Sequence, residues 1–280
     1  MTGSPVELNP IPQANVLGVG VHAVNMSLAL EVIEGAIAQR HRGYVCATGV
    51  HGVMEARRDP SLRSLFVDAL LVVPDGMPTV WMGRAQGLPG MERVFGPDLM
   101  LTVASRSELT GWSHFLYGGE DGVAEQLRDM LCSRFPSMSI VGTYTPPFRR
   151  LTGEEEQELT RTLERARPDI VWVGLSTPKQ ERFMAEYLPL LNTTLMIGVG
   201  AAFDFHTGRI ADSPAWVKQC GLQWLHRLIQ EPSRLWKRYL LNNPRFAIEA
   251  GLQLAGVRRY ELPDSAGGLQ RQLLLSARKI

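Results

Sequence analysis

Short apolar runs alternate along this chain with longer segments of helical periodicity, and this alternation constrains the fold more than any other feature. Each short run is apolar at nearly every position, as expected for strands buried on both faces of a parallel sheet. The rhythm therefore predicts an α/β protein. The predicted strands are Asn15–Val21, Tyr44–Thr48, Ala69–Val73, Ser113–Tyr117, Met138–Gly142, Asp169–Gly174 and Thr194–Val199, and the predicted helices are Met26–Gln39, Pro97–Ser107, Val123–Phe135, Glu154–Arg167 and Lys179–Leu188.

The pattern changes after about Gly208. Residues 218–245 carry six Lys or Arg residues and one acid, Glu231, which gives this segment a local charge of +5. Apolar residues recur there at helical spacing, and Pro232 is expected to divide the segment into two helices. We predict a Rossmann-like core of mostly parallel strands with helices on both faces over residues 1–208, a basic amphipathic helical appendage over 209–261 and a flexible tail over 262–280.

The basic appendage has two interpretations at this stage. Amphipathic basic helices with Trp and Tyr bind anionic membrane surfaces. The alternative is a helix pair that packs on the core and exposes its charged face to solvent, or that packs against another subunit in a homo-oligomer. Sequence alone does not decide between these arrangements.

Composition narrows the class of protein. The chain is 45% hydrophobic and 20% charged with a formal net charge of +1, so it is neither disordered nor a strongly basic nucleic-acid binder. The three cysteines, Cys46, Cys132 and Cys220, lie far apart, which predicts neither disulfides nor a zinc site and fits a reducing cytoplasmic compartment. We find no apolar run suited to span a membrane and no signal peptide.

Polar and glycine residues follow the predicted strands at the places where parallel sheets bind ligands. Asp75 comes directly after an apolar strand, where partial burial would raise the pKa of its carboxyl toward the range of a general base. It could equally be a turn or helix-cap residue before Gly76. The other strand-end candidates are Thr48, His51, Gly118, Gly119, Gly174, Gly200 and Asp204, of which the Gly118-Gly119 turn suits backbone contact with a nucleotide or its phosphates.

Three other chemistries are disfavoured. The segment Gly18-Val-Gly20-Val-His-Ala23 formally matches a dinucleotide fingerprint, but the next strand ends without the acid that would bind a ribose. Pro178 stands where a nucleophile elbow after Gly174 would need its second glycine. The histidines have no metal-ligand spacing and no Asp-x-Asp occurs, so we predict neither a metal nor a cofactor.

Several blocks together resemble the WecG/TagA/CpsF family of bacterial glycosyltransferases over roughly residues 15–245. The blocks occur in order and at similar separations. They are Leu71-Val-Val-Pro-Asp75-Gly76, Leu88-Pro-Gly-Met-Glu-Arg93-Val-Phe-Gly96-Pro-Asp98-Leu99, Gly174-Leu-Ser-Thr-Pro178-Lys-Gln180-Glu181, Gly198-Val-Gly200-Ala-Ala-Phe203-Asp204-Phe-His-Thr-Gly208, and the stretch from Gly221 through Trp224, Arg227, Glu231, Arg234 and Arg238 to Tyr239.

The resemblance implies an inverting, metal-independent enzyme that moves a sugar from a UDP-sugar to a polyprenyl-diphosphate-linked sugar at the inner face of the cytoplasmic membrane. It serves the biosynthesis of a surface polysaccharide such as an exopolysaccharide, a capsule or a teichoic acid linkage. It implies that Asp75 is the general base and that Thr48 and Gln180 orient the substrates. Arg93 would meet a phosphate, and Arg227, Arg234 and Arg238 would belong to an appendage that acts as a lid and membrane-docking element.

The sequence departs from the family pattern at Val50 and His51 after Thr48, at Gln223 before Trp224, and in the segment Ile210-Ala-Asp212-Ser-Pro214. These departures leave the donor sugar open among N-acetylmannosamine, its uronic acid and glucose. They also keep an alternative function in view, a noncatalytic nucleotide-sugar-binding scaffold at the membrane.

Overall fold

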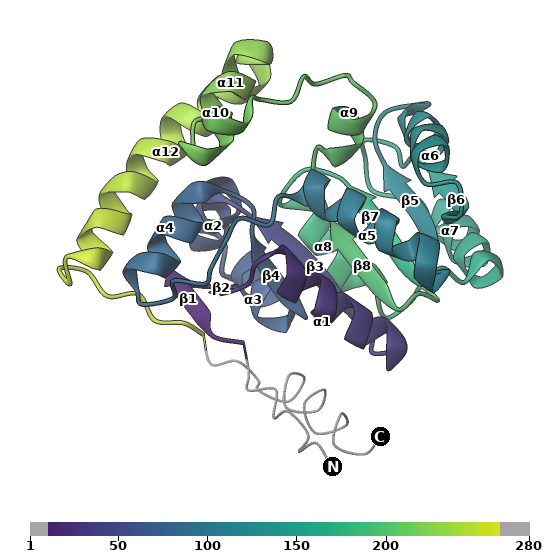
Figure 1. The fold of residues 1–280 in the computed structure, drawn as a ribbon, viewed down its shortest axis with the longest axis horizontal. Coiled ribbons are helices and arrows are strands. Elements are labelled where there is room, and N and C mark those ends of the chain that lie inside the picture. Colours follow the sequence, from purple (N-terminus) through teal and green to yellow (C-terminus); the bar gives the residue numbers. More distant parts are fainter. Residues whose placement is uncertain (1–10, 264–280) are drawn as a thin grey trace, which may run out of the picture.

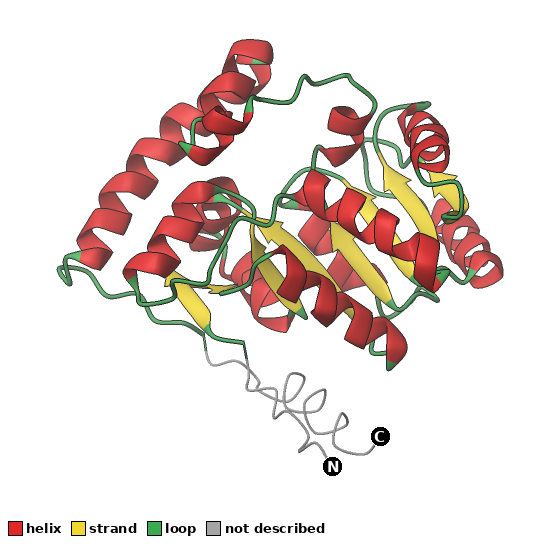
Figure 2. Cartoon of the chain, in the orientation of Figure 1, coloured by secondary structure: helices red, strands yellow, loops and turns green. Residues whose placement is uncertain are grey.

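The computed structural model describes residues 11–263. Six strands form one parallel sheet (Figures 1 and 2). The prediction of an α/β fold is therefore confirmed, with six of the seven predicted strands in this sheet. The strand order across the sheet is β4 (Leu71–Pro74), β3 (Gly43–Thr48), β8 (Leu195–Gly198), β7 (Ile170–Gly174), β5 (Ser113–Gly118) and β6 (Ser139–Tyr144).

Both faces of the sheet are buried, because successive residues of a strand point to opposite sides. Val45 packs in one apolar cluster and its neighbour Cys46 in the other, and Trp172 and Val173 divide in the same way. One cluster contains residues of α1 (Met26–Ala38), α5 (Gly96–Thr110), α6 (Val123–Arg134) and α9 (Ala202–His206), and the other contains residues of α2 (Val50–Arg58), α3 (Pro60–Asp68), α4 (Met77–Ala85), α7 (Gly153–Ala166) and α8 (Lys179–Tyr187).

The predicted strand Asn15–Val21 is wrong as a member of the sheet. It forms a separate antiparallel hairpin of β1 (Gln13–Val16) and β2 (Val19–His22), which turns at Leu17 and Gly18. Both turn residues have positive φ, 54° and 87°, as two-residue hairpin loops require. The Asn15 side chain accepts a hydrogen bond from the Gly18 N–H at 2.8 Å, which stabilises the turn. The run Asn15–Val21 therefore contains a turn, which its continuous hydrophobicity did not indicate.

Three nine-residue helices, α2, α3 and α4, were not predicted. They lie close after β3 and β4. Each is too short to show the long helical periodicity that predicted the other helices. Asp59 caps α3 by accepting from the Ser61 and Leu62 N–H groups. Thr152 caps α7 in a capping box with Glu155, and Gly122 is the N-cap of α6.

The C-terminal part of the described chain consists of α10 (Ala215–Gln219), α11 (Gln223–Gln230) and the long α12 (Pro232–Leu254). Pro232 is the first residue of α12, so the predicted division into two helices is confirmed. In Figure 1 these helices lie along one side of the molecule, with α12 beside α2 and α4. No helix within residues 11–263 has the length and apolar character needed to cross a bilayer. The predicted tail from residue 264 lies outside the described residues.

The far end of α12 is tied to the core through Glu249. Its carboxylate accepts hydrogen bonds from Tyr260 and Arg258 and pairs with Arg57 of α2. The Tyr260 hydrogen bond and the two arginines lower the pKa of Glu249 to about 2. Gln253 in the last turn also binds the backbone of the β1–β2 turn region at Asn15 and Leu17. The second half of α12 is therefore part of the packed structure.

Candidate active site

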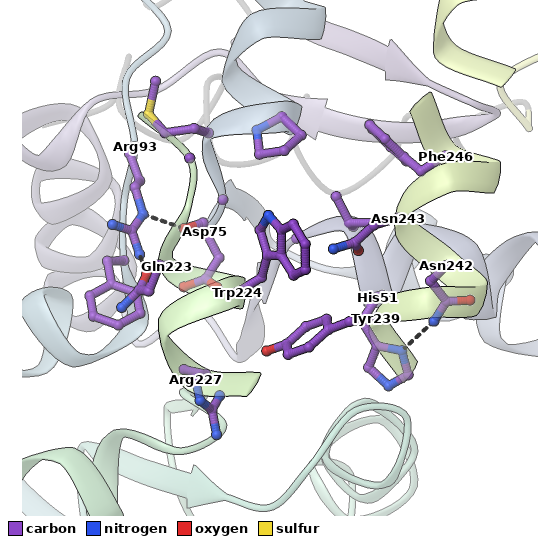
Figure 3. A pocket seen from close by; sticks show the side chains of 18 of the residues that line it. His51, Asp75, Arg93, Gln223, Trp224, Arg227, Tyr239, Asn242, Asn243 and Phe246 are labelled. Carbon is purple, nitrogen blue, oxygen red and sulfur yellow. Dashed lines mark hydrogen bonds between the residues drawn. The ribbon is translucent and has the colours of Figure 1, made fainter. Parts of the chain in front are cut away.

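A cavity of about 820 Å³ opens between the carboxyl ends of the sheet strands and the helices α11 and α12. Its floor comes from the segments after β3, β4 and β8, and its far wall from α11 and α12 (Figure 3). Of the predicted site residues, the structure brings eight together in the lining of this cavity. They are His51, Asp75, Arg93, Gln180, Gly200, Arg227, Arg234 and Arg238.

Asp75 is the only carboxylate among the described residues that line the cavity. Its backbone is fixed on both sides, because its N–H donates to the Thr48 carbonyl at 3.1 Å and its own carbonyl accepts from Arg93 Nε at 2.6 Å. Its Oδ1 accepts from the N–H of Gly96, the first residue of α5, at 2.9 Å. Its Oδ2 has no hydrogen-bond partner within residues 11–263 and is free to act on a bound molecule.

Burial raises the pKa of Asp75 above its usual value, although Arg93, the Gly96 N–H and Arg227 oppose this rise by favouring the charged form. Desolvation makes a carboxylate a stronger base, and here it outweighs the N-terminus of α5, which stabilises the charged form. Asp75 therefore has the geometry and the proton affinity of a general base. Its position as a helix-start residue, the alternative considered from sequence, does not conflict with this role.

Gln180 lines the cavity, but both atoms of its side-chain amide form hydrogen bonds with other protein groups. Its Oε1 accepts from the Gly200 N–H at 2.9 Å, and its Nε2 donates to Glu181 Oε1 at 3.0 Å. Thr177 Oγ1 also donates to Glu181, whose pKa is raised by burial. Gln180 thus holds Gly200 in its left-handed conformation, with φ of 56°, at the end of β8.

His51 lies in the first turn of α2, in a chain of hydrogen bonds that joins the core to α12. Its Nε2 is 3.2 Å from the Thr177 carbonyl, and its Nδ1 is 3.2 Å from Asn242 Nδ2 (Figure 3). Arg58 donates to Asn242 Oδ1 at 2.6 Å, so the Asn242 amide presents its donor side to the ring. Burial lowers the pKa of His51 to about 4, which keeps the ring neutral near pH 7.

The cationic wall of the cavity comes from α11 and α12. Arg227 and Arg234 both pair with Glu231, which lies between the two helices. Arg238 has no ion pair or hydrogen bond with the residues that the structure describes, and burial lowers its pKa. Lys218 also lines this wall, and Arg93 donates to Gln223 from the opposite side. A region this rich in cations suits a ligand with a diphosphate group.

Five predicted site residues lie outside the lining of this cavity. Thr48 is buried beneath it, and its Oγ1 has no hydrogen-bond partner among the described residues. Gly118, Gly119 and Gly174 allow close packing: a Cβ on Gly118 would lie 2.6 Å from the Gly174 carbonyl oxygen, and one on Gly174 would meet the ring of Phe203. Asp204 lies on α9, where burial raises its pKa.

Sequence reasoning missed an aromatic and amide wall on the appendage. Trp224 and Tyr239 meet edge to face, with ring centroids 5.8 Å apart, and both line the cavity with Asn242 and Phe246. Tyr239, Asn242 and Phe246 are spaced three and four residues apart, so helical periodicity would have placed them on one face of α12. That periodicity was present in the sequence but was interpreted only as an amphipathic face for the membrane, the core or another subunit.

The sequence model described as "Glycosyl transferase WecG/TagA/CpsF family" matches residues 14–260. The chain belongs to this family. The matched residues include the appendage. Helices α11 and α12 therefore belong to the architecture of the WecG/TagA/CpsF family together with the sheet.

Two curated proteins similar to this WecG/TagA/CpsF member carry the same name, N-acetylglucosaminyldiphosphoundecaprenol N-acetyl-beta-D-mannosaminyltransferase. The one from Bacillus subtilis strain 168 is 30% identical over 177 residues, which cover 63% of this chain and 66% of the relative. The one from Bacillus spizizenii is 27% identical over 192 residues, which cover 69% of this chain and 72% of the relative. The first alignment thus spans just under two thirds of the relative's length.

Proposed function

We propose that this glycosyltransferase moves N-acetylmannosamine from UDP-N-acetylmannosamine to the N-acetylglucosamine of a diphosphoundecaprenol-linked acceptor, with inversion at the anomeric carbon. The observation that carries the proposal is a single desolvated carboxylate, Asp75, with one free oxygen in a cavity whose other charged lining residues are all cations. The names of the two Bacillus relatives supply the substrate pair.

In the proposed reaction, Asp75 Oδ2 accepts the proton of an acceptor hydroxyl while the hydroxyl oxygen attacks the anomeric carbon of the donor. The new C–O bond forms as the bond to the UDP oxygen breaks, and UDP leaves with the electron pair. The proton on Asp75 then passes to solvent. A single displacement of this kind inverts the anomeric centre, and the lining offers no second carboxylate for a double displacement.

Departure of UDP places negative charge on a diphosphate, and we assign its stabilisation to the arginines of α11 and α12. Arg227 and Arg234 are the candidates to bind the UDP diphosphate, whereas Arg238, which has no protein partner among the described residues, is the candidate to bind the diphosphate of the acceptor. The proposed reaction needs no metal, and residues 11–263 hold no group of three or more His, Cys, Asp or Glu side chains arranged around a common point.

The exposed side of the appendage is proposed to bind the anionic surface of the membrane that holds the acceptor. Trp236, Leu240 and Ile248 on α12 are 47%, 58% and 65% exposed, and Ile229 on α11 is 74% exposed. Lysine and arginine side chains on the same helices supply attraction to acidic lipids. Flotation with vesicles containing acidic lipid should recover the protein, and serine at positions 236, 240 and 248 together should reduce the recovered fraction.

The test of the reaction is UDP release from a panel of UDP-sugars, with and without a GlcNAc-diphosphate-lipid acceptor, in the presence of EDTA. We expect acceptor-dependent release with UDP-N-acetylmannosamine and a β-linked product by NMR. An α-linked product would contradict the single displacement, and loss of activity in EDTA would contradict metal independence. UDP-sugar binding without release on any acceptor would instead favour the scaffold alternative.

A further inference from the structure

The cavity does not end at Asp75 but continues between α4 and α12. At this end the lining contains no charged side chain among the described residues. Trp81, Met82 and Ala85 of α4 and Phe246, Ala250 and Leu254 of α12 line this part of the cavity, and Met82, Phe246 and Ala250 among them are almost fully buried. The cavity that holds the candidate base is therefore continuous with an apolar groove, which we define by these six residues.

The face of α12 that lines the cavity changes in character along the helix. Arg234 and Arg238 are followed by the amides Asn242 and Asn243, and then by the residues of the apolar groove from Phe246 to Leu254. At 1.5 Å per residue, the distance along the axis from Arg238 to Leu254 is about 24 Å. This sequence of cation, amide and hydrocarbon corresponds in order to a molecule with an anionic head and an apolar chain.

The groove is open to solvent at its end. Gly251 lines it there and is exposed, and a Cβ added to Gly251 would meet no atom within 4 Å. Trp81 and Leu254 are 47% and 48% exposed, so large apolar surfaces remain uncovered where the groove meets solvent. Contiguous exposed apolar surface next to a polar site is typical of a binding groove for an apolar group.

We propose that the apolar groove between α4 and α12 binds the first isoprene units of the acceptor's polyprenyl chain, while its diphosphate lies at Arg238 and its sugar at Asp75. The inference rests on the proposed function and adds a site for the lipid chain to it. The protein would then recognise its acceptor by the hydrocarbon as well as by the sugar, because the chain would leave the membrane surface to enter the groove.

A series of acceptors with different chains tests this. GlcNAc-diphosphate carrying a methyl, geranyl or farnesyl group is assayed by UDP release without membranes and below micelle-forming concentrations. Burial of the longer chain should raise kcat/KM about tenfold or more from methyl to farnesyl in the wild type. Gly251→Leu, whose side chain projects into open space in the groove, should reduce this farnesyl-to-methyl ratio toward one.

The matched control is Gly35→Leu, the same change at a glycine of α1 where a Cβ also meets no atom within 4 Å. Both variants gain helix propensity, so misfolding is not expected to account for a difference between them. The control should keep the wild-type ratio. A wild-type ratio near one, or an unchanged ratio in Gly251→Leu, would overturn the groove assignment while leaving the transferase intact.

Binding by calorimetry separates the groove from the reaction. Farnesyl diphosphate should bind more tightly than inorganic diphosphate, and Gly251→Leu should remove most of this advantage. If farnesyl diphosphate binds more tightly than inorganic diphosphate but no acceptor supports UDP release, the groove assignment is supported and the proposed function is contradicted. If the two ligands bind equally, the groove assignment is wrong whatever the enzyme does.

Discussion

The sheet core and the α10–α12 appendage are built in different ways. In the core, apolar side chains on both faces of the sheet are almost completely buried, whereas α11 has no buried residue and α12 buries five of its 23. The core supplies the candidate base, Asp75, and the appendage supplies Arg227, Arg234 and Arg238. In the proposed reaction, the closely packed region thus fixes the group that accepts the proton, and the lightly packed region provides the charges that bind the diphosphate.

The sharpest test of the core's part in this comparison is Asp75→Asn. Asn retains an oxygen for the Gly96 N–H but cannot accept the proton, so we expect kcat to fall by about 10²–10⁴. The melting temperature should not fall, because burial raises the pKa of Asp75 and its charge is therefore unfavourable in the folded state. Asp98→Asn, at a nearby exposed acid, is the control for both measurements. Turnover within a factor of ten of wild type would remove Asp75 from the role of base.

The appendage's part is tested by Arg238→Ala. Loss of a charge-assisted contact to a diphosphate should lower kcat/KM for a short-chain acceptor about 10- to 100-fold. Lys237→Ala is the matched control, since Lys237 is the adjacent cation on α12 but does not line the cavity. Equal effects of the two variants in a membrane-free assay would show that only the overall charge of the appendage matters.

The connection between the two regions is tested by Glu249→Gln. This side chain is 9% exposed and joins α2, α12 and the segment after α12, so we expect a loss of roughly 1–3 kcal/mol in the free energy of unfolding. The pKa of Glu249 is lowered to about 2, so its contribution is present above pH 4.5 and is lost as the pH falls toward 2. Urea denaturation at pH 7 and pH 3 measures both effects. Asp129→Asn, in an exposed pair with Arg128, should change little.

The smallest expected effect is on the pH profile. Activity requires ionised Asp75, and burial raises its pKa, so the acid limb of kcat/KM should have its midpoint above the usual value for Asp of about 3.9. His51→Gln should keep this limb, because the proposed reaction assigns it to Asp75; burial lowers the pKa of His51 to about 4, so this variant is needed to separate the two titrations. If the acid limb disappears in His51→Gln, the titrating group is His51, at the contact between core and appendage, and not Asp75.

The strands were predictable because continuous apolar runs are typical of strands buried on both faces, and the residues at their ends indicated Asp75 and Gly200. The strand order was not predictable. Gly118 ends β5 and Gly119 follows it. This strand is separated from β3 by β7 and β8, so the two glycines lie outside the cavity that Asp75 lines. The hairpin at Leu17 was missed because its turn lies within an apolar run.

The hydrogen-bond partners and packing of the predicted residues were not predictable from the sequence. Sequence could place Gln180 near the site, but not that its amide is taken up by Gly200 and Glu181. The wall of Trp224, Tyr239 and Asn242 depends on how α12 packs across the sheet ends. Such packing is set by contacts between distant segments, which periodicity within one segment does not encode.

Glu231 pairs with Arg227 and Arg234, so an anion that binds these arginines would replace a protein carboxylate. A diphosphate that engages these two guanidinium groups must displace a carboxylate already bound to them, so the net gain is a difference between two ion pairs. The same carboxylate can take the arginines back when the product leaves. In the proposed reaction, tight binding of the charged product is thereby avoided, so UDP can leave this cationic site after each transfer.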